Sequence, residues 1–328
     1  MNSSANLNPK LFDPDIEKVP TRDGFGQGLV LAAQANENVV GLCADLTEST
    51  RMQEFAEKFP NRYFEIGVAE QNLVTVAAGM AHEGKIPFTS SYATFSPGRN
   101  WEQIRTTICY NDVPVKIIGS HAGLSVGPDG ATHQALEDIA IMRALPNMIV
   151  ISPTDSIEAR KATEAIARIN KPCYLRLSRD KVPVITTEST PFEIGKAEIF
   201  HEGNDVTIIA TGQMVYKALQ VAKELQLHKI SVRVINCHTI KPLDNKTILQ
   251  AAEETGAIIT VEEHQITGGL GGAVAELLSQ NFPVPLKIIG VEDRFGESGE
   301  PNELLEKFGL TKEAIIKAVT QVLRMKGK

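Results

Sequence analysis

Short runs of Val, Ile and Leu alternate along the whole chain with segments whose apolar residues recur at helical spacing. The runs are nearly continuous instead of alternating with polar residues, which is typical of strands covered on both faces in a parallel sheet. We expect such strands at 39–46, 63–67, 87–92, 115–120, 148–152, 173–177, 206–211, 231–237, 257–262 and 286–291.

The segments between these runs predict amphipathic helices. Apolar residues follow the i, i+3, i+4, i+7 spacing in the four stretches 74–81, 162–169, 218–225 and 315–322, so each helix presents one stripe to a sheet. Asp155 followed by Glu158 has the spacing of a capping box at a helix start. Alternating strands and helices predict an α/β fold of two domains, with mostly parallel sheets covered by helices.

Domain boundaries follow from length and from one change in composition. A chain of 328 residues is typical of two domains. The stretch 181–195 is rich in Pro, Thr and Glu and lacks helical period, so we expect a linker there. The prediction is an N-terminal arm or loose tail at 1–18, a first domain at 19–185, a linker at 186–199 and a second domain at 200–328.

Composition excludes several classes of function. The net charge of −7 disfavours binding to nucleic acid or to an anionic membrane surface. The apolar stretch at 73–81 is too short to span a bilayer, and the first 18 residues lack the apolar core of a secretory signal. No C-x-x-C pair is present, so we expect buried free thiols and a reducing, cytoplasmic location. The four cysteines are Cys43, Cys109, Cys173 and Cys237.

A carboxylate stands where a strand-like run ends and a helical pattern begins. Glu70 lies in the segment EIGVAEQNLVTVAAG, at 65–79. In open α/β sheets, ligands bind at such strand ends. The plainer interpretation is an acid that complements the helix dipole.

A glycine-rich loop at 120–134, SHAGLSVGPDGATHQ, follows another strand. It carries His121, Asp129 and His133, and histidine is the side chain suited to moving protons near neutral pH. The histidines are alternatively packed or capping residues. Their spacing matches no common zinc pattern.

Further candidates are polar or aromatic residues near strand ends. Arginine suits bidentate recognition of phosphate, although most surface arginines have no such role. The aromatic candidates belong either to the core or to a stacking surface. The glycines at 267–272 suit either an anion at a helix start or a tight helix–sheet contact. The polar candidates are Arg22, Asp45, Ser49 and Arg179, and the aromatic ones are Tyr92, Phe95 and Trp101.

Taken together, these segments resemble the C-terminal half of transketolase, its pyrimidine-binding domain plus its C-terminal domain. The resemblance runs from about Arg22 to the end of the chain and is carried by ADLTEST, FEIGVAEQN, SYATF, SHAGLSVGPDGATHQ, RALPNM and LRLSR. Synthases of 1-deoxyxylulose 5-phosphate and β subunits of 2-oxo-acid dehydrogenases share the architecture. The THQ and RALPNM segments favour transketolase over these two families.

The resemblance implies a thiamine diphosphate cofactor and assigns residues to it. Glu70 matches the family's catalytic glutamate, whose carboxyl group hydrogen-bonds ring nitrogen N1′ and so assists loss of the thiazolium C2 proton. Phe95 matches an aromatic residue packed on the pyrimidine, and Asp45 an acid near the cofactor. Tyr92 and Trp101 are candidates for the remaining aromatic contacts.

The same resemblance assigns substrate-binding residues. His121 and His133 would bind substrate hydroxyls and the carbonyl and help to move protons. Asp129 would recognise the C2 hydroxyl group. The phosphate-binding positions match Arg22, Ser49 and Arg179.

The resemblance also implies a partner chain. Full-length transketolases hold Mg²⁺ and the cofactor's diphosphate on an N-terminal domain with a G-D-G segment, which this sequence lacks. We therefore expect an N-terminal subunit that supplies the diphosphate site and the metal ligands, in an assembly of two copies of each chain. The alternatives are a split deoxyxylulose-phosphate synthase, a 2-oxo-acid dehydrogenase β-type subunit, or a non-catalytic regulatory subunit of the same fold.

Overall fold

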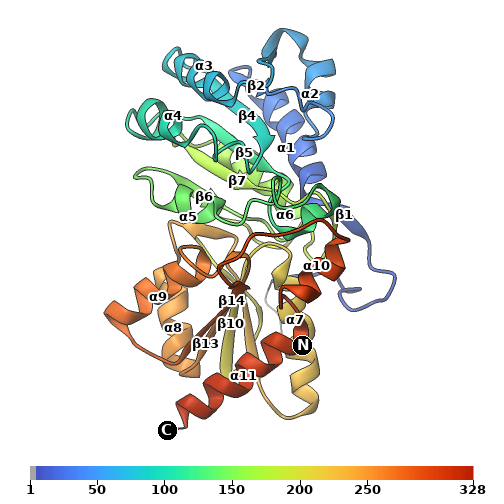
Figure 1. Ribbon diagram of the computed structural model, residues 1–328, viewed down its shortest axis with the longest axis vertical. Coiled ribbons are helices and arrows are strands. Elements are labelled where there is room, and N and C mark those ends of the chain that lie inside the picture. The colour runs from blue at the N-terminus through green and yellow to red at the C-terminus, as the bar shows by residue number, and fades with distance from the viewer. Residues whose placement is uncertain (1–4, 328) are drawn as a thin grey trace.

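The computed structural model describes residues 5–327 and shows two α/β units stacked along the long axis of the molecule (Figure 1). The first unit contains β1 (Lys18–Pro20), α1 (Thr21–Ala35), β2 (Val39–Cys43), α2 (Gln53–Lys58), η1 (Pro60–Arg62), β3 (Tyr63–Glu65), α3 (Glu70–His82), β4 (Ile86–Tyr92), α4 (Trp101–Gln103), η2 (Ile104–Cys109), β5 (Lys116–Ser120), η3 (Leu124–Asp129), α5 (Asp138–Arg143), β6 (Ile149–Ile151), α6 (Ser156–Ala167), β7 (Cys173–Arg176) and β8 (Lys181–Pro183). The second contains β9 (Glu198–His201), β10 (Val206–Ala210), α7 (Met214–Leu227), β11 (Val232–Asn236), β12 (Thr239–Lys241), α8 (Asn245–Thr255), β13 (Ile258–Gln265), α9 (Leu270–Asn281), β14 (Leu286–Val291), α10 (Pro301–Lys307) and α11 (Lys312–Lys326).

Both units are built on a mostly parallel sheet. The larger sheet has the strand order β12-β6-β7-β5-β4-β2-β3, and the smaller one has β14-β13-β10-β11-β9. In each sheet only one edge strand is antiparallel, β12 beside β6 and β9 beside β11. The predicted α/β class, with helix-covered parallel sheets, is confirmed.

Every expected strand is present, but four short ones had no signal in the sequence. These are β1, β8, β9 and β12, each of three or four residues. Each is too short to show a continuous apolar run, and each lies at an edge or in a two-stranded ribbon. Strand β9 begins inside the stretch expected to be a linker, and β12 leaves the second unit to join the sheet of the first.

The predicted helix stripes face the core. Val74, Ala77 and Ala78 of α3 are buried, as are Ile315 and Val319 of α11. The predicted cap of α6 is also confirmed, because the Asp155 side chain accepts from the backbone N–H of Glu158 at 3.0 Å.

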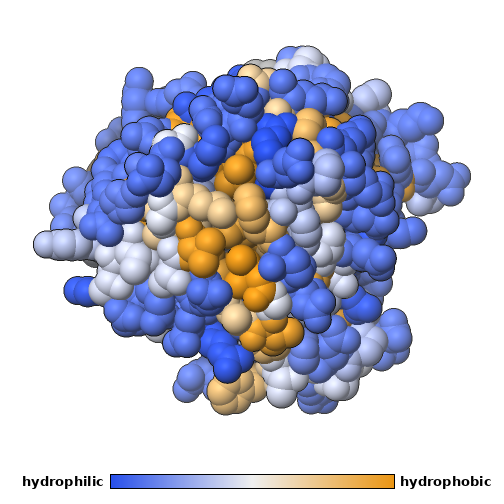
Figure 2. Space-filling model, turned by 90° about the horizontal axis from the view of Figure 1, so that it is seen from above, coloured by the Kyte–Doolittle hydropathy of each residue, from blue (hydrophilic) through white to orange (hydrophobic). Residues whose placement is uncertain are grey.

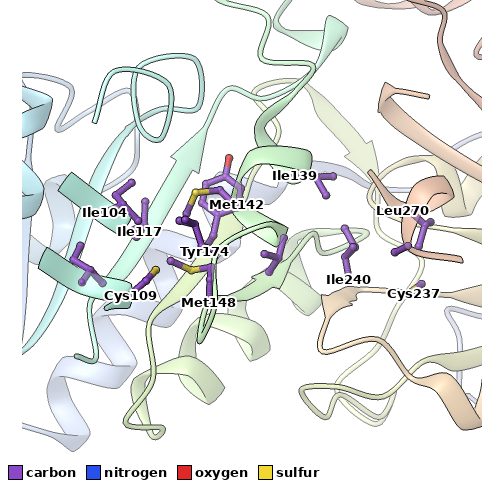
Figure 3. Close-up of a cluster of buried hydrophobic side chains, with 14 of the residues drawn as sticks. Ile104, Cys109, Ile117, Ile139, Met142, Met148, Tyr174, Cys237, Ile240 and Leu270 are labelled. Carbon is purple, nitrogen blue, oxygen red and sulfur yellow. The ribbon is translucent and has the colours of Figure 1, made fainter. Parts of the chain in front are cut away.

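One hydrophobic core crosses the boundary between the two units. Tyr174 and Met142 of the first unit belong to the same buried cluster as Ile240 and Leu270 of the second, and Figure 3 shows the first pair at the centre and the second pair to the right. Burial of apolar surface at about 25 cal/mol per Å² is the dominant favourable term in folding. The two units therefore hold each other in a defined position.

The N-terminal arm packs on the second unit. Ala5, Leu11 and Ile16 are buried within that unit's core cluster, and Lys223 Nζ lies 4.3 Å from the ring centre of Phe12. The part of the arm at 5–17 is therefore not a loose tail, and residues 1–4 lie outside the described residues. No helix within 5–327 is both long and apolar enough to cross a bilayer.

Acid should destabilise the junction between the units through His238. This fully buried ring lies 4.3 Å from the ring of Phe192, and burial lowers the pKa of His238 to about 3. An unfolded histidine titrates near pH 6.5, so below that pH protons bind the unfolded state preferentially and stability falls until the pH reaches the folded pKa. At pH 5 the loss is about 2 kcal/mol for this group.

The measurement is urea unfolding at pH 7.5 and pH 5 for the wild type and His238→Gln. We expect the variant to lose about 2 kcal/mol less than the wild type over that interval. An identical pH dependence in both proteins would contradict this assignment.

Candidate active site

The first unit gathers its polar candidates at one edge of the sheet. Strands β2, β3, β4, β5 and β7 run parallel, so their carboxyl ends meet at the same edge. Asp45 follows β2, Glu70 follows β3, Tyr92 ends β4, His121 follows β5 and Arg179 follows β7. This is the position where open α/β sheets bind ligands.

Glu70 is a buried carboxylate with one free acceptor. It is the first residue of α3 and only 3% exposed. Ser91 Oγ donates to Oε1 at 3.5 Å, whereas Oε2 accepts no hydrogen bond from the described residues. Arg99 Nη1 lies 3.9 Å from Oε2. A buried carboxylate oxygen without a donor is rare in folded proteins, and it marks a place for a ligand's hydrogen-bonding group.

Three residues that sequence reasoning missed support this carboxylate. Ser91 and Arg99 face its two oxygens, and Asn100 Nδ2 donates to the backbone carbonyl of Glu70 at 2.9 Å. Their only sequence signal was proximity to Tyr92 and Phe95 in the chain. Side chains of that type are common on surfaces, so the signal was too weak to select them.

His121 is held as a neutral imidazole. Arg22 Nη1 lies 3.1 Å from its Nε2, and Ser120 Oγ lies 2.9 Å from its Nδ1. A guanidinium can only donate, so Nε2 accepts and the proton sits on Nδ1, which donates to Ser120. Burial lowers the pKa of His121 to about 3, and the positive charge of Arg22 acts in the same direction. Its backbone adopts a left-handed conformation, with φ of 57°.

An aromatic group surrounds the two histidines. The Tyr92 ring stacks on His121 with centres 3.9 Å apart and meets the edge of His133 at 6.1 Å. Phe95 meets His133 at 5.3 Å. The structure thus brings four of the sequence-predicted site residues, from the end of β4, the segment after it and the loop after β5, into one cluster.

The predicted phosphate-binding residues form a cationic group beside this cluster. Arg22 Nη1 donates to the backbone carbonyl of Ser49 at 2.7 Å, and Arg179 Nη1 donates to that of Val126 at 2.6 Å. Both arginines line one pocket with Arg51 and Lys181, which sequence reasoning missed. Four cations in one concavity suit an anionic group, although the three acids Asp23, Asp180 and Glu300 share the pocket.

Asp45 and Asp129 occupy exposed positions. The backbone N–H of Asp45 donates to Glu65 Oε1 at 2.8 Å, and Asp45 itself adopts φ of 58°. Asp129 ends the η3 segment, on the exposed side of the loop between the two histidines. Trp101 points elsewhere, because its Nε1 donates to the backbone carbonyl of Ile141 at 2.9 Å.

In the glycine-rich segment at 267–272, a side chain of the same chain occupies the position where an anion could bind. The Glu262 carboxylate accepts from the backbone N–H groups of Leu270 and Gly271, each at 2.7 Å. A Cβ atom added at Gly271 would lie 2.5 Å from Ile288 Cγ2. The segment is therefore a close-packed helix start satisfied from within the chain. Within residues 5–327 no group of three or more His, Cys, Asp or Glu is placed to hold a metal ion.

Comparison with known proteins covers nearly the whole chain. The family model described as transketolase, pyrimidine binding domain, matches residues 17–184, and the one described as transketolase, C-terminal domain, matches residues 195–315. The chain is 45% identical over 306 residues to a putative transketolase C-terminal section of Methanocaldococcus jannaschii, which covers 92% of this chain and 96% of the relative.

Two further similarities concern split enzymes. The chain is 42% identical over 315 residues to the 6-deoxy-6-sulfo-D-fructose transketolase subunit SqwH of a Clostridium species, covering 96% of this chain and 98% of that subunit. A solved structure described as a split gene transketolase, inactive β4 tetramer, superimposes with a TM-score of 0.89 at 46% identity, covering 94% of this chain and 99% of that one.

Proposed function

This chain belongs to the transketolase family, and from that premise we propose that it is the C-terminal subunit of a split, thiamine-diphosphate-dependent transketolase. It would transfer a two-carbon ketol unit between sugar phosphates once assembled with a chain that carries the diphosphate and Mg²⁺ site. The observation that carries the proposal is the buried Glu70 carboxylate, whose Oε2 lacks a donor at the ligand-binding edge of the sheet.

The residues fit the pyrimidine end of thiamine diphosphate. Glu70 Oε2 would hold a proton shared with ring nitrogen N1′, which satisfies the one free acceptor of that carboxylate. Phe95 and Tyr92 would pack against the ring, and Asp45 would lie near the cofactor. When bound, thiamine diphosphate supplies the carbon nucleophile that accepts the ketol unit. The Mg²⁺ ligands are proposed to lie on the partner chain.

Substrate contacts are assigned to the neighbouring cluster. Neutral His121 can both donate and accept at a sugar oxygen once a substrate displaces its present partners. His133 would bind the carbonyl or hydroxyl groups of the sugar and help to move protons, and Asp129 would bind the C2 hydroxyl. The phosphate end would lie among Arg22, Ser49 and Arg179, and the two arginines line a pocket that holds four cations and three acids.

An exposed apolar surface near Glu70 supports a partner subunit. Phe64 is 37% exposed and Val68 is 69% exposed, and both precede Glu70 in the chain. Figure 2, which views the molecule from the end where α2 and α3 lie, shows apolar surface gathered near the centre of that face. Burial of such a patch stabilises an interface. We propose that the N-terminal subunit covers it, in an assembly of two copies of each chain.

The domain boundaries and location remain part of the proposal. Family matches at 17–184 and 195–315 support domains at 19–185 and 200–328 joined by a linker. All four cysteines are free and buried, which supports the reducing environment of the cytoplasm.

Reconstitution tests the proposed function. The purified chain alone should show no ketol transfer, because we propose that the partner chain supplies the site for the cofactor's diphosphate. Addition of a partner chain that carries a G-D-G segment, with thiamine diphosphate and Mg²⁺, should produce transfer from a ketose phosphate to an aldose phosphate. The readout is the sugar product, with each chain alone as the control.

Two results would contradict the proposal. Ketol transfer by the isolated chain would remove the need for a partner. Consumption of pyruvate in place of the ketose phosphate would assign the complex to deoxyxylulose-phosphate synthesis or 2-oxo-acid oxidation instead.

A further inference from the structure

The second unit supplies a buried carboxylate to the loop between the two histidines. Glu263 lies on β13 and is 5% exposed. Its Oε1 accepts from the backbone N–H of Ser125 at 2.6 Å, and Gln213 of the second unit donates to its Oε2. Each oxygen of the carboxyl group thus accepts one hydrogen bond, and a buried N–H that loses its acceptor costs about 1–3 kcal/mol. This contact therefore fixes the middle of a loop that belongs to the other unit.

The loop that Glu263 holds also supports the phosphate pocket. Ser125 lines that pocket together with Arg22 and Arg179. The adjacent residue, Val126, accepts the hydrogen bond of Arg179 Nη1 at 2.6 Å. A displacement of Ser125 and Val126 would therefore move the support of a guanidinium that is proposed to bind the substrate.

The backbone of this loop does not select its own conformation. Gly123, Gly127 and Gly130 have φ values of 89°, 80° and 76°, and glycine adopts other conformations as readily. A Cβ atom added at Gly123 would lie 2.5 Å from the Glu263 carboxyl carbon, so the loop is closely fitted to that side chain. Contacts from outside the loop must therefore stabilise one of its possible conformations.

A second set of hydrogen bonds also holds the loop in place. Gln134 Nε2 lies within hydrogen-bonding distance of the carbonyls of Leu124 and Gly127, each at 3.2 Å, and of Glu297 at 2.9 Å. Residue 297 belongs to the second unit, in the segment before α10. Both sets of contacts thus tie the loop at 123–134 to the second unit, and Glu263 supplies the side-chain acceptor for the loop's backbone.

We propose that Glu263 is a positioning residue for ketol transfer, which sets the geometry of the loop that carries Asp129 and supports Arg179. The inference rests on the proposed function for its catalytic consequence. It gives the second unit a part in the proposed active site.

The neighbouring acid provides a matched control. Glu262 is equally buried and also accepts two backbone N–H bonds, but these come from the start of α9 and not from the loop. A general loss of stability should follow from removal of either carboxylate. Only Glu263 should affect the loop and the substrate that it contacts.

The test compares Glu263→Ala, Glu263→Gln and Glu262→Ala. Hydrogen exchange is measured on the isolated chain, and steady-state kinetics on the complex reconstituted with its partner. Glu263→Ala should speed amide exchange at 123–130 and raise KM for the sugar phosphate by about tenfold, the size of leaving one buried N–H without an acceptor, with a smaller change in kcat. Glu263→Gln keeps an acceptor for Ser125, so its exchange rate and its KM should both lie within about twofold of the wild-type values.

Glu262→Ala should leave the loop's exchange and KM near the wild-type values, even if its melting temperature falls as far as that of Glu263→Ala. If Glu263→Ala does not fold, Gln213→Ala replaces it, because this half-buried residue restrains the same carboxylate. Unchanged loop exchange, or equal KM values for the two alanine variants, would overturn the proposal. Absence of ketol transfer in the wild-type complex would refute the proposed function instead, and the exchange data would still decide the loop's dependence on Glu263.

Discussion

Replacement of Glu70 with alanine should lower ketol transfer by the assembled enzyme roughly 10²–10⁴-fold, the usual contribution of a positioned acid or base. The reason is geometric. The carboxylate is 3% exposed, and its Oε2 accepts no hydrogen bond from the described residues. Asp45, the other acid assigned to the cofactor, is exposed and so does not share that buried position. The measurement is kcat of the complex saturated with thiamine diphosphate.

The matched control is Gln71→Ala, which changes the next residue of α3 on its exposed face. It should retain full activity and normal assembly with the partner. Glu70→Gln adds a second check, since it keeps the size of the side chain but cannot give up a proton. If the Glu70→Ala complex retains activity within a few-fold of the wild type, the carboxylate mechanism is wrong.

Replacement of Asp138 with alanine should lower the free energy of unfolding by about 3–5 kcal/mol, because it leaves a buried guanidinium unpaired. Asp138 is 1% exposed and accepts from Tyr174 Oη at 2.7 Å and from Arg176 Nε at 2.8 Å. Burial alone would raise the pKa of Asp138, but the Arg176 charge and these hydrogen bonds lower it. The stabilisation is therefore present at neutral pH and is lost as the pH falls through the folded-state pKa.

The comparison is with an exposed ion pair of similar length. Lys58 Nζ lies 2.6 Å from Glu54 Oε1 on the surface of α2, and Glu54→Ala should cost about 0.5 kcal/mol or less. Both variants are measured by urea unfolding at pH 7.5. A loss below about 1 kcal/mol for Asp138→Ala would show that the buried pair is not needed to satisfy Arg176.

The fold was largely predictable from local patterns. Continuous apolar runs such as that of β10 predict strands, and the stripe 315–322 predicts α11, because burial on one or both faces leaves a direct mark on composition. Strand β12 left no mark, because its three residues pair with β6 from a distant part of the chain. The packing of the arm at 5–17 was also invisible, since isolated apolar residues such as Leu11 carry no period.

The candidate site was likewise predictable only in part from the sequence. Glu70 and His121 were found because each follows a strand, and parallel strands place their carboxyl ends together. Ser91, Arg99 and Glu263 were not found, because nothing in their local sequence shows that they face Glu70 or the loop at 120–134.

The sequence by itself determined the two-unit α/β architecture, the family and the positions of the acid and the histidines, because each depends on residues close together in the chain. Only the tertiary structure decided which of them touch. Arg22 reaches His121 across 99 positions, and Glu263 reaches Ser125 across 138. Contacts of that kind arise when separate elements pack on a common core, so the free energy that fixes them comes from the whole fold and leaves no periodic signal in either segment.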